Sequence, residues 1–357
     1  MHLLRLGQIL GDFSLFLLGF FVLTIICFLF ISKIYRSKAS GFLKNFFIAL
    51  FFGIVCIAFF FISFEFYYRY IYDDSDALGF LLTNQHWLDK HVIYNNYFFR
   101  DDKQFQIQEK PGVTRIGVVG DSLAFGYGIS NVKDRFSDLL EADLNKAGKH
   151  VEVYNMGRPG LDTCGEIPTF DKIKFIHFDI IVWSFFINDI QPCGHSTGSD
   201  IITSVKKPTG FVGFLEQHSF FFNFMYWRLR GTHQKVFAQA KFADLDQYKN
   251  PVAVKLEEDS IATFSAMLKQ DGNTKVVGLI FPLLFLMGPN YPGKEAESWI
   301  KTQLTQNGVS PVIDLLPLLI NKNPNDITAN QFDWHPNEAV HKMAADQLYK
   351  AILPLLK

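Results

Sequence analysis

The sequence has no excess of charge of either sign. Lys and Arg total 34 and Asp and Glu total 35, which gives a formal net charge of −1 at pH 7. Nucleic-acid-binding proteins usually carry a basic stripe along one face, and no predicted face of this chain has one. We therefore expect no nucleic acid among its partners.

Cysteine is scarce, and most histidines stand apart from other metal-binding residue types. The chain has four cysteines and ten histidines, and the histidines outside the motifs described below lack the spacing of metal ligands. These isolated histidines include His177, His195, His218 and His341. The sequence therefore predicts no metal site, and it shows no internal repeat or low-complexity tract.

Two long apolar runs are the most prominent feature that is present. The chain has 39 phenylalanines, and its apolar excess is concentrated before residue 66. The runs Phe13–Ser32 and Phe46–Phe64 are uncharged, and each has close to the ~20 residues that a membrane-spanning helix needs. A cleaved signal peptide has a shorter apolar core and would leave the second run unexplained. We therefore expect a transmembrane helical hairpin over residues 1–66.

The charges beside the two runs indicate their orientation. The connector between the runs carries four basic side chains, Lys33, Arg36, Lys38 and Lys44. The segment after the second run has one basic residue, Arg69, and four acidic residues, Glu65, Asp73, Asp74 and Asp76. Because basic loops stay on the cytoplasmic side, we expect a hairpin in the cytoplasmic (inner) membrane. The rest of the chain then lies on the periplasmic or extracellular side, with an aromatic belt over residues 66–72 at the outer interface.

After residue 113, apolar stretches with strand character alternate with stretches of helical spacing. The predicted strands are Ile116–Val119, Val151–Tyr154, Phe178–Phe186, Thr274–Phe281 and Pro311–Asp314. This alternation predicts a parallel sheet with helices on both faces. The domain should cover residues 113–357, with 67–112 as a linker that packs on it and an insertion at about 195–250 beside the site.

A sharp turn with an exposed serine follows the first strand, at Gly120-Asp121-Ser122. Gly120 gives the backbone the freedom that a tight exit requires. Ser122 then lies at the carboxyl end of the strand, the edge at which open α/β sheets bind ligands. Its hydroxyl and its backbone N–H can both face one substrate atom. Taken alone, this tripeptide favours an ordinary turn between a strand and a helix.

Three further blocks accompany that turn, and the four form one set. The blocks are Gly120-Asp121-Ser122 continued by Phe125-Gly126-Tyr127-Gly128, then Asn155-Met156-Gly157-Arg158-Pro159-Gly160, then Asn188-Asp189, then Asp333-Trp334-His335-Pro336-Asn337. Together they resemble the SGNH (GDSL-type) hydrolase family of esterases and lipases, over roughly residues 95 to 355. The upstream stretch 96–101 resembles the lead-in of membrane-anchored bacterial members. The resemblance implies a three-layer α/β/α sandwich with a mostly parallel, flavodoxin-like sheet.

The resemblance also implies a catalytic set. Ser122 is the candidate nucleophile, and His335 is the candidate base, because a serine hydroxyl attacks only when a base takes its proton. Asp333 would orient the imidazole. The spacing here is Asp-X-His, whereas many family members have Asp-X-X-His, and Phe332 occupies the place of that aspartate. Other branches of the family use the shorter spacing.

Acyl transfer further needs donors for the developing oxyanion, each worth roughly 3 kcal/mol of barrier. By resemblance these are the backbone N–H groups of Ser122 and Gly160 and the side-chain amide of Asn188. Family members usually have Gly two residues before this Asn, and here Phe186 stands there and should reshape the pocket. We expect Phe186 and Trp334 to contact substrate. The serine mechanism needs neither a metal nor another cofactor.

Two other features carry open alternatives. Cys27 and Cys56 fall in the apolar runs, whereas Cys164 and Cys193 each follow an oxyanion block, so a disulfide between the latter two is a hypothesis for an oxidising compartment. Free thiols are the alternative.

The aromatic run 220–227 has seven large apolar residues in eight, too many for one helix face. It lines an acyl pocket, docks at the membrane interface with Arg228 and Arg230, or packs onto the core.

Taken together, the sequence favours a membrane-anchored serine esterase. It would hydrolyse O-acyl esters, acetyl or longer, of envelope glycans or lipids through an acyl-enzyme. Two alternatives remain: an O-acyltransferase that moves the acyl group to a sugar hydroxyl, and a catalytically silent envelope scaffold. The expected partners are the acylated substrate, the membrane and proteins of envelope biosynthesis.

Overall fold

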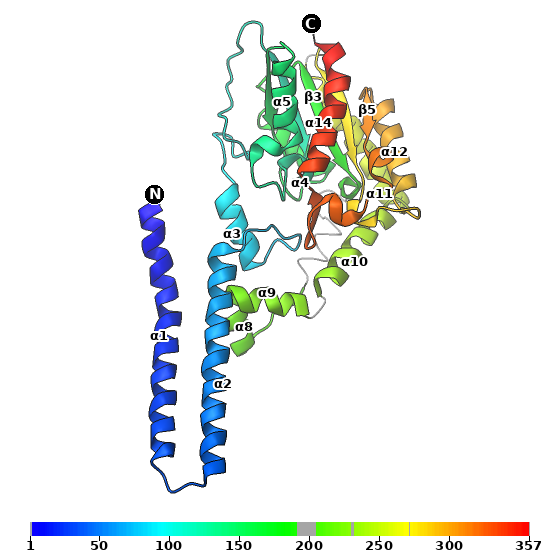
Figure 1. The fold of residues 1–357 in the computed structure, drawn as a ribbon. Helices are drawn as coiled ribbons and strands as arrows, with labels where there is room; N and C mark the ends of the chain where they lie inside the picture. The colour runs from blue at the N-terminus through cyan, green and yellow to red at the C-terminus, as the bar shows by residue number, and fades with distance from the viewer. Residues whose placement is uncertain (1, 191–204, 230–231, 271, 357) are drawn as a thin grey trace. The chain divides into compact units, whose positions relative to one another are not determined.

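The computed structural model describes residues 2–190, 205–229, 232–270 and 272–356 (Figure 1). The chain divides into two compact units. The first comprises Met1–Asp73 and Lys207–Leu229, and the second comprises Asp74–Lys206 and Arg230–Lys357. The stretch 67–112 is therefore shared, because residues 67–73 belong to the first unit and residues 74–112 to the second.

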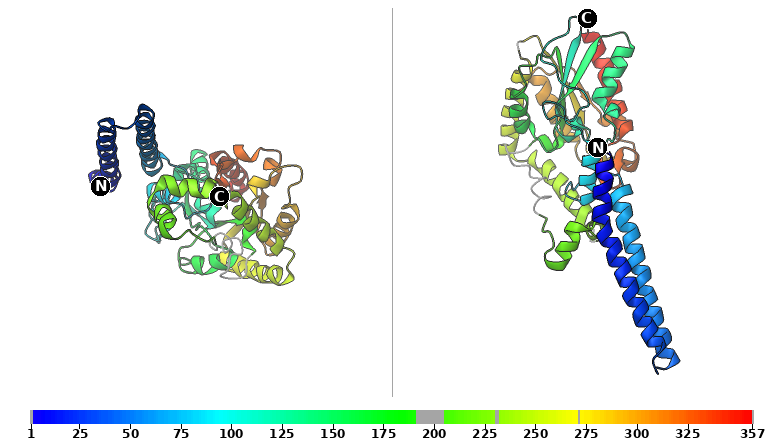
Figure 2. Two further views of the ribbon diagram at one scale, coloured as in Figure 1. Left: turned by 90° about the horizontal axis from the view of Figure 1, so that it is seen from below. Right: turned by 90° about the vertical axis from the view of Figure 1, so that its left-hand side faces the viewer.

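Two long apolar helices dominate the first unit. Helix α1 (His2–Tyr35) and helix α2 (Gly41–Phe66) run side by side (Figure 2), and the π-helical turn η1 (Tyr67–Ile71) continues α2. Ser40 caps α2, since its side chain accepts a hydrogen bond from the backbone N–H of Leu43. By length and composition, the stretches 16–35 and 41–71 are each able to cross a membrane, and almost none of either stretch is buried.

Two shorter helices complete the first unit. Helix α8 (Gly210–His218) and helix α9 (Phe220–Leu229) follow each other closely, and α9 packs on α2 and η1. The ring of Phe224 stacks on Tyr68 with 4.5 Å between centroids, and the ring of Phe221 stacks on Phe64 at 5.1 Å. The aromatic run 220–227 therefore packs within this unit.

The second unit contains a five-stranded sheet in the order β2-β1-β3-β4-β5, in which all neighbours are parallel. The strands are β1 (Thr114–Gly120), β2 (Val151–Asn155), β3 (Ile180–Phe186), β4 (Lys275–Phe281) and β5 (Val312–Asp314). This is the flavodoxin-like order, so the predicted α/β fold is confirmed. Nearly all residues of β1, β3 and β4 are buried, as expected for strands covered on both faces.

Helices cover both faces of this sheet (Figure 1). Helix α5 (Phe136–Lys146) packs with α14 (Glu338–Ile352) on one side, and α11 (Pro251–Leu268) packs with α6 (Thr163–Asp171) and α12 (Lys294–Gln306) on the other. The remaining elements are α3 (Leu82–His91), α4 (Ser122–Phe125), α10 (Thr232–Gln247), α13 (Leu316–Leu319), and a small antiparallel ribbon of β6 (Thr328–Asn330) and β7 (Asp333–Pro336).

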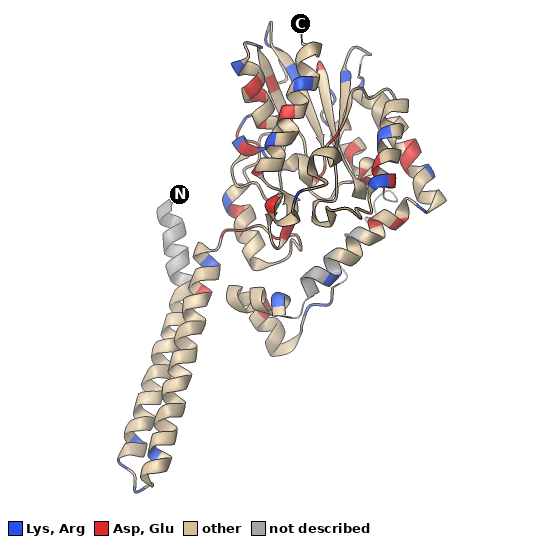
Figure 3. Cartoon of the chain, turned by 45° about the vertical axis from the view of Figure 1, so that its right-hand side comes forward, with Lys and Arg blue, Asp and Glu red and all other residues tan. Residues whose placement is uncertain are grey.

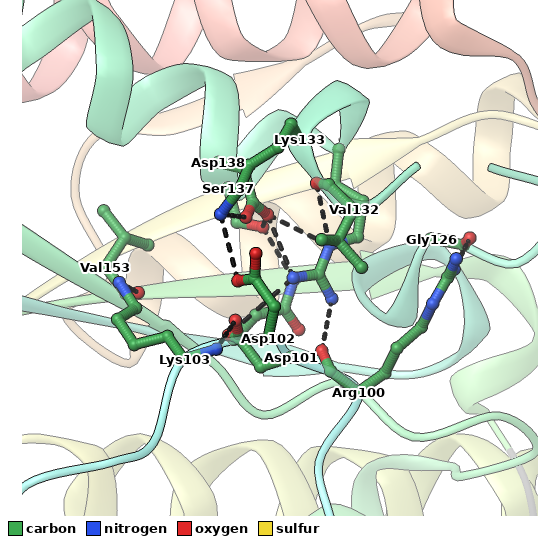
Figure 4. A network of polar contacts seen from close by, with 12 residues as sticks. Arg100, Asp101, Asp102, Lys103, Gly126, Val132, Lys133, Ser137, Asp138 and Val153 are labelled. Carbon is green, nitrogen blue, oxygen red and sulfur yellow. Dashed lines mark hydrogen bonds and ion pairs between the residues drawn. The ribbon is translucent and has the colours of Figure 1, made fainter. Parts of the chain in front are cut away.

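Buried arginines fix the segment that leads into the sheet. The guanidinium of Arg100 lies against Gly126 (Figure 4) and donates to its carbonyl oxygen at 2.6 Å. It also donates to the carbonyl oxygen of Ile129 at 2.5 Å. Arg135 donates in turn to the carbonyl oxygen of Arg100 at 2.7 Å. Since Gly126 and Ile129 lie in the loop that follows Ser122, Arg100 holds that loop in place.

Candidate active site

The turn after β1 exposes Ser122 at the carboxyl edge of the sheet. Gly120 has φ of 152°, and a Cβ there would lie 2.8 Å from the carbonyl oxygen of Ser184 on β3. Only glycine fits this close approach. The side chain of Asp121 then accepts from the backbone N–H of Leu123 at 2.9 Å, which starts α4 with Ser122 as its first residue. Asp121 thus caps α4.

Three predicted site residues come together in one hydrogen-bonded line. Nε2 of His335 lies 3.0 Å from Oγ of Ser122, and Nδ1 of His335 lies 2.5 Å from Oδ1 of Asp333. Asp333 and His335 belong to the strand β7, in which alternate side chains point to the same face. The Asp-X-His spacing therefore brings both side chains to one side of β7. This geometry needs no aspartate at position 332.

The charge state of Asp333 suits this line of hydrogen bonds. Its complete burial would raise the carboxyl pKa, but the adjacent His335 and hydrogen bonds from His335 and Ser75 outweigh burial and hold the pKa below its ordinary value. The carboxylate is then charged at neutral pH and accepts a hydrogen bond from the protonated Nδ1 of His335. This arrangement leaves Nε2 of His335 as the acceptor that faces the hydroxyl of Ser122.

A serine far upstream completes the hydrogen bonding of Asp333. The hydroxyl of Ser75 donates to Oδ2, the carboxylate oxygen that does not face His335. Asn330 holds the backbone of Ser75 by donating to its carbonyl oxygen at 3.0 Å, and the N–H of Ala77 donates to the carbonyl oxygen of Phe332 at 3.0 Å. Sequence reasoning missed Ser75 because the residues around it show no clear periodicity and no motif.

A tyrosine packs against the histidine ring. The rings of Tyr127 and His335 lie 4.8 Å apart between centroids, and the Tyr127 hydroxyl accepts from the side-chain amide of Asn84 at 2.7 Å. Asn84 is itself fixed, since its amide oxygen accepts from the backbone N–H of Asp76 at 2.9 Å. Burial raises the pKa of Tyr127 well above its usual value. Tyr127 therefore stays neutral and limits the motion of the imidazole.

The residues expected to stabilise an oxyanion line the same cavity as the histidine. This cavity has a volume of about 300 Å³, and its walls include Ser122, Gly160, Asn188 and His335. Gly160 has φ of 75°, a left-handed conformation that favours glycine. Asn188 lies in the short turn η3 (Ile187–Asp189), directly after β3. The cavity thus offers room for an ester group beside Ser122.

Apolar side chains form much of the remaining wall. Phe186 and Trp334, both expected to contact substrate, line this cavity. The ring of Trp334 stacks on Phe285 with 4.2 Å between centroids, and Leu284 lies beside them in the lining.

Buried carboxyl groups lie behind the oxyanion residues. Asp189 accepts from the backbone N–H of Phe186 at 2.7 Å, which supports the turn that carries Asn188. Trp183 donates to Glu166 at 2.8 Å. Burial, together with neighbouring carboxylates, raises the pKa of both Glu166 and Asp189 well above ordinary values. The sequence analysis did not identify Glu166.

The remaining sequence expectations concern cysteine, histidine and metals. Cys164 is disulfide-bonded, whereas Cys193 and His195 lie outside the described residues, so the pairing of Cys164 with Cys193 stays a prediction. His341 is buried and its Nδ1 accepts from the backbone N–H of Phe136 at 3.1 Å, which is a structural role. Within the described ranges, no three His, Cys, Asp or Glu side chains gather in a metal-binding arrangement.

Comparison with known proteins finds similar solved structures only. No protein-family model and no curated protein matches the sequence. The lipase Lip_vut3 from a goat rumen metagenome is 14% identical, covering 67% of this chain and 97% of its own, with a TM-score of 0.37. The psychrotrophic esterase EstA from Pseudoalteromonas sp. is 14% identical, covering 68% and 98%, with a TM-score of 0.39.

A member of the lipolytic protein G-D-S-L family from Veillonella parvula is 13% identical, covering 67% of this chain and 98% of its own, with a TM-score of 0.35. Because all three TM-scores lie below 0.5, conclusions about the chemistry of this chain depend on its own residues.

Proposed function

We propose that this protein is a serine ester hydrolase of the SGNH type, with Ser122 as nucleophile, His335 as general base and acid, and Asp333 as the group that orients the imidazole. The observation that carries the proposal is the line of hydrogen bonds from Ser122 through His335 to Asp333 beside a cavity of about 300 Å³. This arrangement supplies the three groups that activate a serine hydroxyl: a nucleophile, a base and a carboxylate that orients the base.

The proposed reaction begins when Oγ of Ser122 attacks the ester carbonyl carbon and passes its proton to Nε2 of His335. The carbonyl oxygen becomes an oxyanion, which the N–H groups of Ser122 and Gly160 and the amide of Asn188 would stabilise. Collapse of this intermediate releases the alcohol, which takes the proton from His335 and leaves an acyl-serine. Water then attacks the acyl carbon as His335 accepts its proton, and Ser122 regains that proton when the carboxylic acid departs.

The proposed substrates are O-acyl esters, acetyl or longer, of envelope glycans or lipids. Two observations support this class. The cavity is at the small end of ligand sites, and its wall includes Phe186, Leu284, Phe285 and Trp334, so it suits an acyl group better than a charged one. The exposed apolar surfaces of α1 and α2 favour a membrane anchor, which would keep the enzyme beside envelope components.

The proposed location is the cytoplasmic membrane, with the second unit on the periplasmic or extracellular side. Basic side chains gather at the loop end of the α1–α2 hairpin, as Figure 3 shows. Because such loops stay in the cytoplasm, the opposite end of the hairpin should face outward.

Turnover of a matched ester series by the full chain in nanodiscs tests the proposal. We expect hydrolysis of p-nitrophenyl esters from acetyl upward, with all turnover lost in Ser122→Ala. Equal turnover by wild type and Ser122→Ala would reject the hydrolase. Transfer of the acyl group to an added sugar, faster than to water, would instead identify an O-acyltransferase.

A further inference from the structure

A buried carboxylate stands at the end of the otherwise apolar helix α2. The side chain of Glu65 is fully buried and accepts five hydrogen bonds. Arg69 donates two of them, from Nε at 2.9 Å and from Nη2 at 2.7 Å. A buried charge is strongly unfavourable unless it is paired and hydrogen-bonded in this way. The contact around Glu65 is therefore specific.

The other three hydrogen bonds come from the start of α9. The hydroxyl of Ser219 donates to Glu65 at 2.7 Å, and the backbone N–H groups of Phe220 and Phe221 donate at 3.1 and 3.0 Å. The first N–H groups of a helix have no partner within the helix and favour a negative charge. Glu65 therefore caps α9 from a different helix and ties its first turn to the last turn of α2.

Arg69 also binds the end of the neighbouring helix α8. Its Nη2 also donates to the carbonyl oxygen of His218, the last residue of α8, at 2.7 Å. The guanidinium carbon lies 4.7 Å from the ring centroid of Phe220 and 5.3 Å from that of Phe16. One ion pair thus holds the corner between α8 and α9 on the end of the α1–α2 hairpin.

This attachment leaves two large apolar side chains of α8 exposed. Phe211 and Phe214 are 75% and 56% exposed, and at a spacing of three residues they lie on one face of the helix. Removing apolar side chains of this size from water is favourable.

The place of attachment indicates what covers this face. The apolar stretch Gly41–Ile71 has 31 residues, which at 1.5 Å per residue span about 46 Å, whereas the hydrocarbon core of a bilayer is about 30 Å thick. The end of this stretch, with Glu65 and Arg69, therefore reaches the headgroup layer on the side away from the basic loop. Exposed aromatic side chains suit that layer.

We propose that α8 and α9 form an interfacial element that lies on the outer surface of the bilayer, with Phe211 and Phe214 inserted among the lipids and the Glu65–Arg69 pair holding the element there. The ligand class is a phospholipid bilayer. The inference rests on the membrane anchor of the proposed function. It also gives the aromatic run 220–227 a role, because that run attaches the element to α2.

Fluorescence quenching in the full chain tests this proposal. Cys27 and Cys56 are replaced by Ala, and a cysteine introduced at Phe211, Phe214, Phe52 or Val252 carries an environment-sensitive dye. The same protein without an introduced cysteine gives the background labelling of Cys164 and Cys193. The proteins are placed in nanodiscs of phosphatidylcholine and phosphatidylglycerol with nitroxide-labelled lipid. Phe52 lies in α2 and is 68% exposed, and Val252 lies in α11 of the second unit and is 66% exposed.

We expect a nitroxide near the headgroup to quench the dye at positions 211 and 214 at least about three-fold more than at Val252, which serves as the control for exposure. Quenching of Phe52 by a nitroxide deep in the acyl chain reports the membrane anchor by itself. If Phe52 is quenched and positions 211 and 214 match Val252, the interfacial element is rejected while the anchor stands. If Phe52 escapes quenching, the anchor of the proposed function is wrong.

Glu65→Gln tests the attachment. We expect it to reduce quenching at Phe214 by at least half and to leave quenching at Phe52 unchanged, because the variant loses the ion pair within the same side-chain volume. Unchanged quenching at Phe214 would overturn the role of Glu65. Disulfide-linked dimers of Phe214→Cys, formed without lipid quenching, would assign the exposed face of α8 to a second copy of the chain and reject the bilayer.

Discussion

The hydroxyl of Ser75 donates a hydrogen bond to Asp333, although 258 residues separate the two in sequence. Asp333 thereby receives a donor on each carboxylate oxygen, His335 on Oδ1 and Ser75 on Oδ2. Both donors favour the charged carboxylate and oppose rotation of the group. The segment that follows the two apolar helices α1 and α2 thus contributes directly to the positioning of the proposed triad.

Removal of this donor should weaken catalysis without removing any reacting group. We expect Ser75→Ala to lower kcat by about 10-fold, since a hydrogen bond to a charged group is worth roughly 1.5–3 kcal/mol. The pKa of Asp333 should rise in the variant, so the acid limb of the pH–rate profile should move to higher pH. Ser75→Thr keeps the hydroxyl and should restore most of the rate. An unchanged rate and profile in Ser75→Ala would mean that Ser75 only supports the fold.

The proposed base and its orienting carboxylate should differ in importance. His335→Ala should lower turnover of a short aryl ester by at least roughly 1,000-fold. Asp333→Asn should cost less than His335→Ala, because the imidazole remains in contact with Ser122. Circular dichroism should show intact folds for both variants. Greater damage from Asp333→Asn with the fold intact would contradict the assigned roles.

The buried Glu257 should make stability depend on pH. Burial raises its pKa to about 8, and the hydroxyl of Thr163 donates to it at 2.6 Å. The folded state therefore binds more protons than the unfolded state between the ordinary glutamate pKa and pH 8, and stability is lost as pH rises through that window. Glu257→Gln should remove most of that loss, because a glutamine side chain does not ionise.

Thermal melting of detergent-solubilised protein between pH 5 and 9 measures this effect. The melting temperature of wild type should fall more steeply toward alkaline pH than that of Glu257→Gln. Glu258→Gln, one position along α11 and only partly buried, serves as the control and should follow wild type. Parallel curves for wild type and Glu257→Gln would refute the assignment.

Topology can be tested in intact cells. A membrane-impermeant thiol reagent should label Asp246→Cys, because Asp246 is exposed and belongs to the second unit. The same reagent should miss Ser40→Cys, which lies in the loop between the two apolar helices. The reverse labelling pattern would move the site into the cytosol and remove the basis for an oxidised cysteine pair.

The centre of the sheet was predictable because β1, β3 and β4 are apolar strands that are buried on both faces. The runs around Val118, Trp183 and Leu279 leave little room for another interpretation, and Gly120 marks the exit from β1. The candidate site was found through short motifs at strand ends. At the strand ends the residue type is determined by the chemistry of the site and depends little on packing.

Contacts of long sequence separation were not predictable. Neither Ser75 nor Glu65 belongs to a periodic pattern, and each is identified only by the partner that folding brings to it, Asp333 and Ser219 respectively. The run 220–227 is too uniformly apolar to show which face packs. Its place on α2 and η1 therefore emerged only with the structure.

The most direct test of the proposed nucleophile is the intact mass of the full chain after reaction with a fluorophosphonate. A phosphonylated serine forms only where a base activates the hydroxyl. We predict one added phosphonyl group per chain, located on Ser122, with no addition to Ser122→Ala and at least about 100-fold slower addition to His335→Ala. Wild-type protein that gains no mass, or gains it on a serine other than Ser122, would contradict the account.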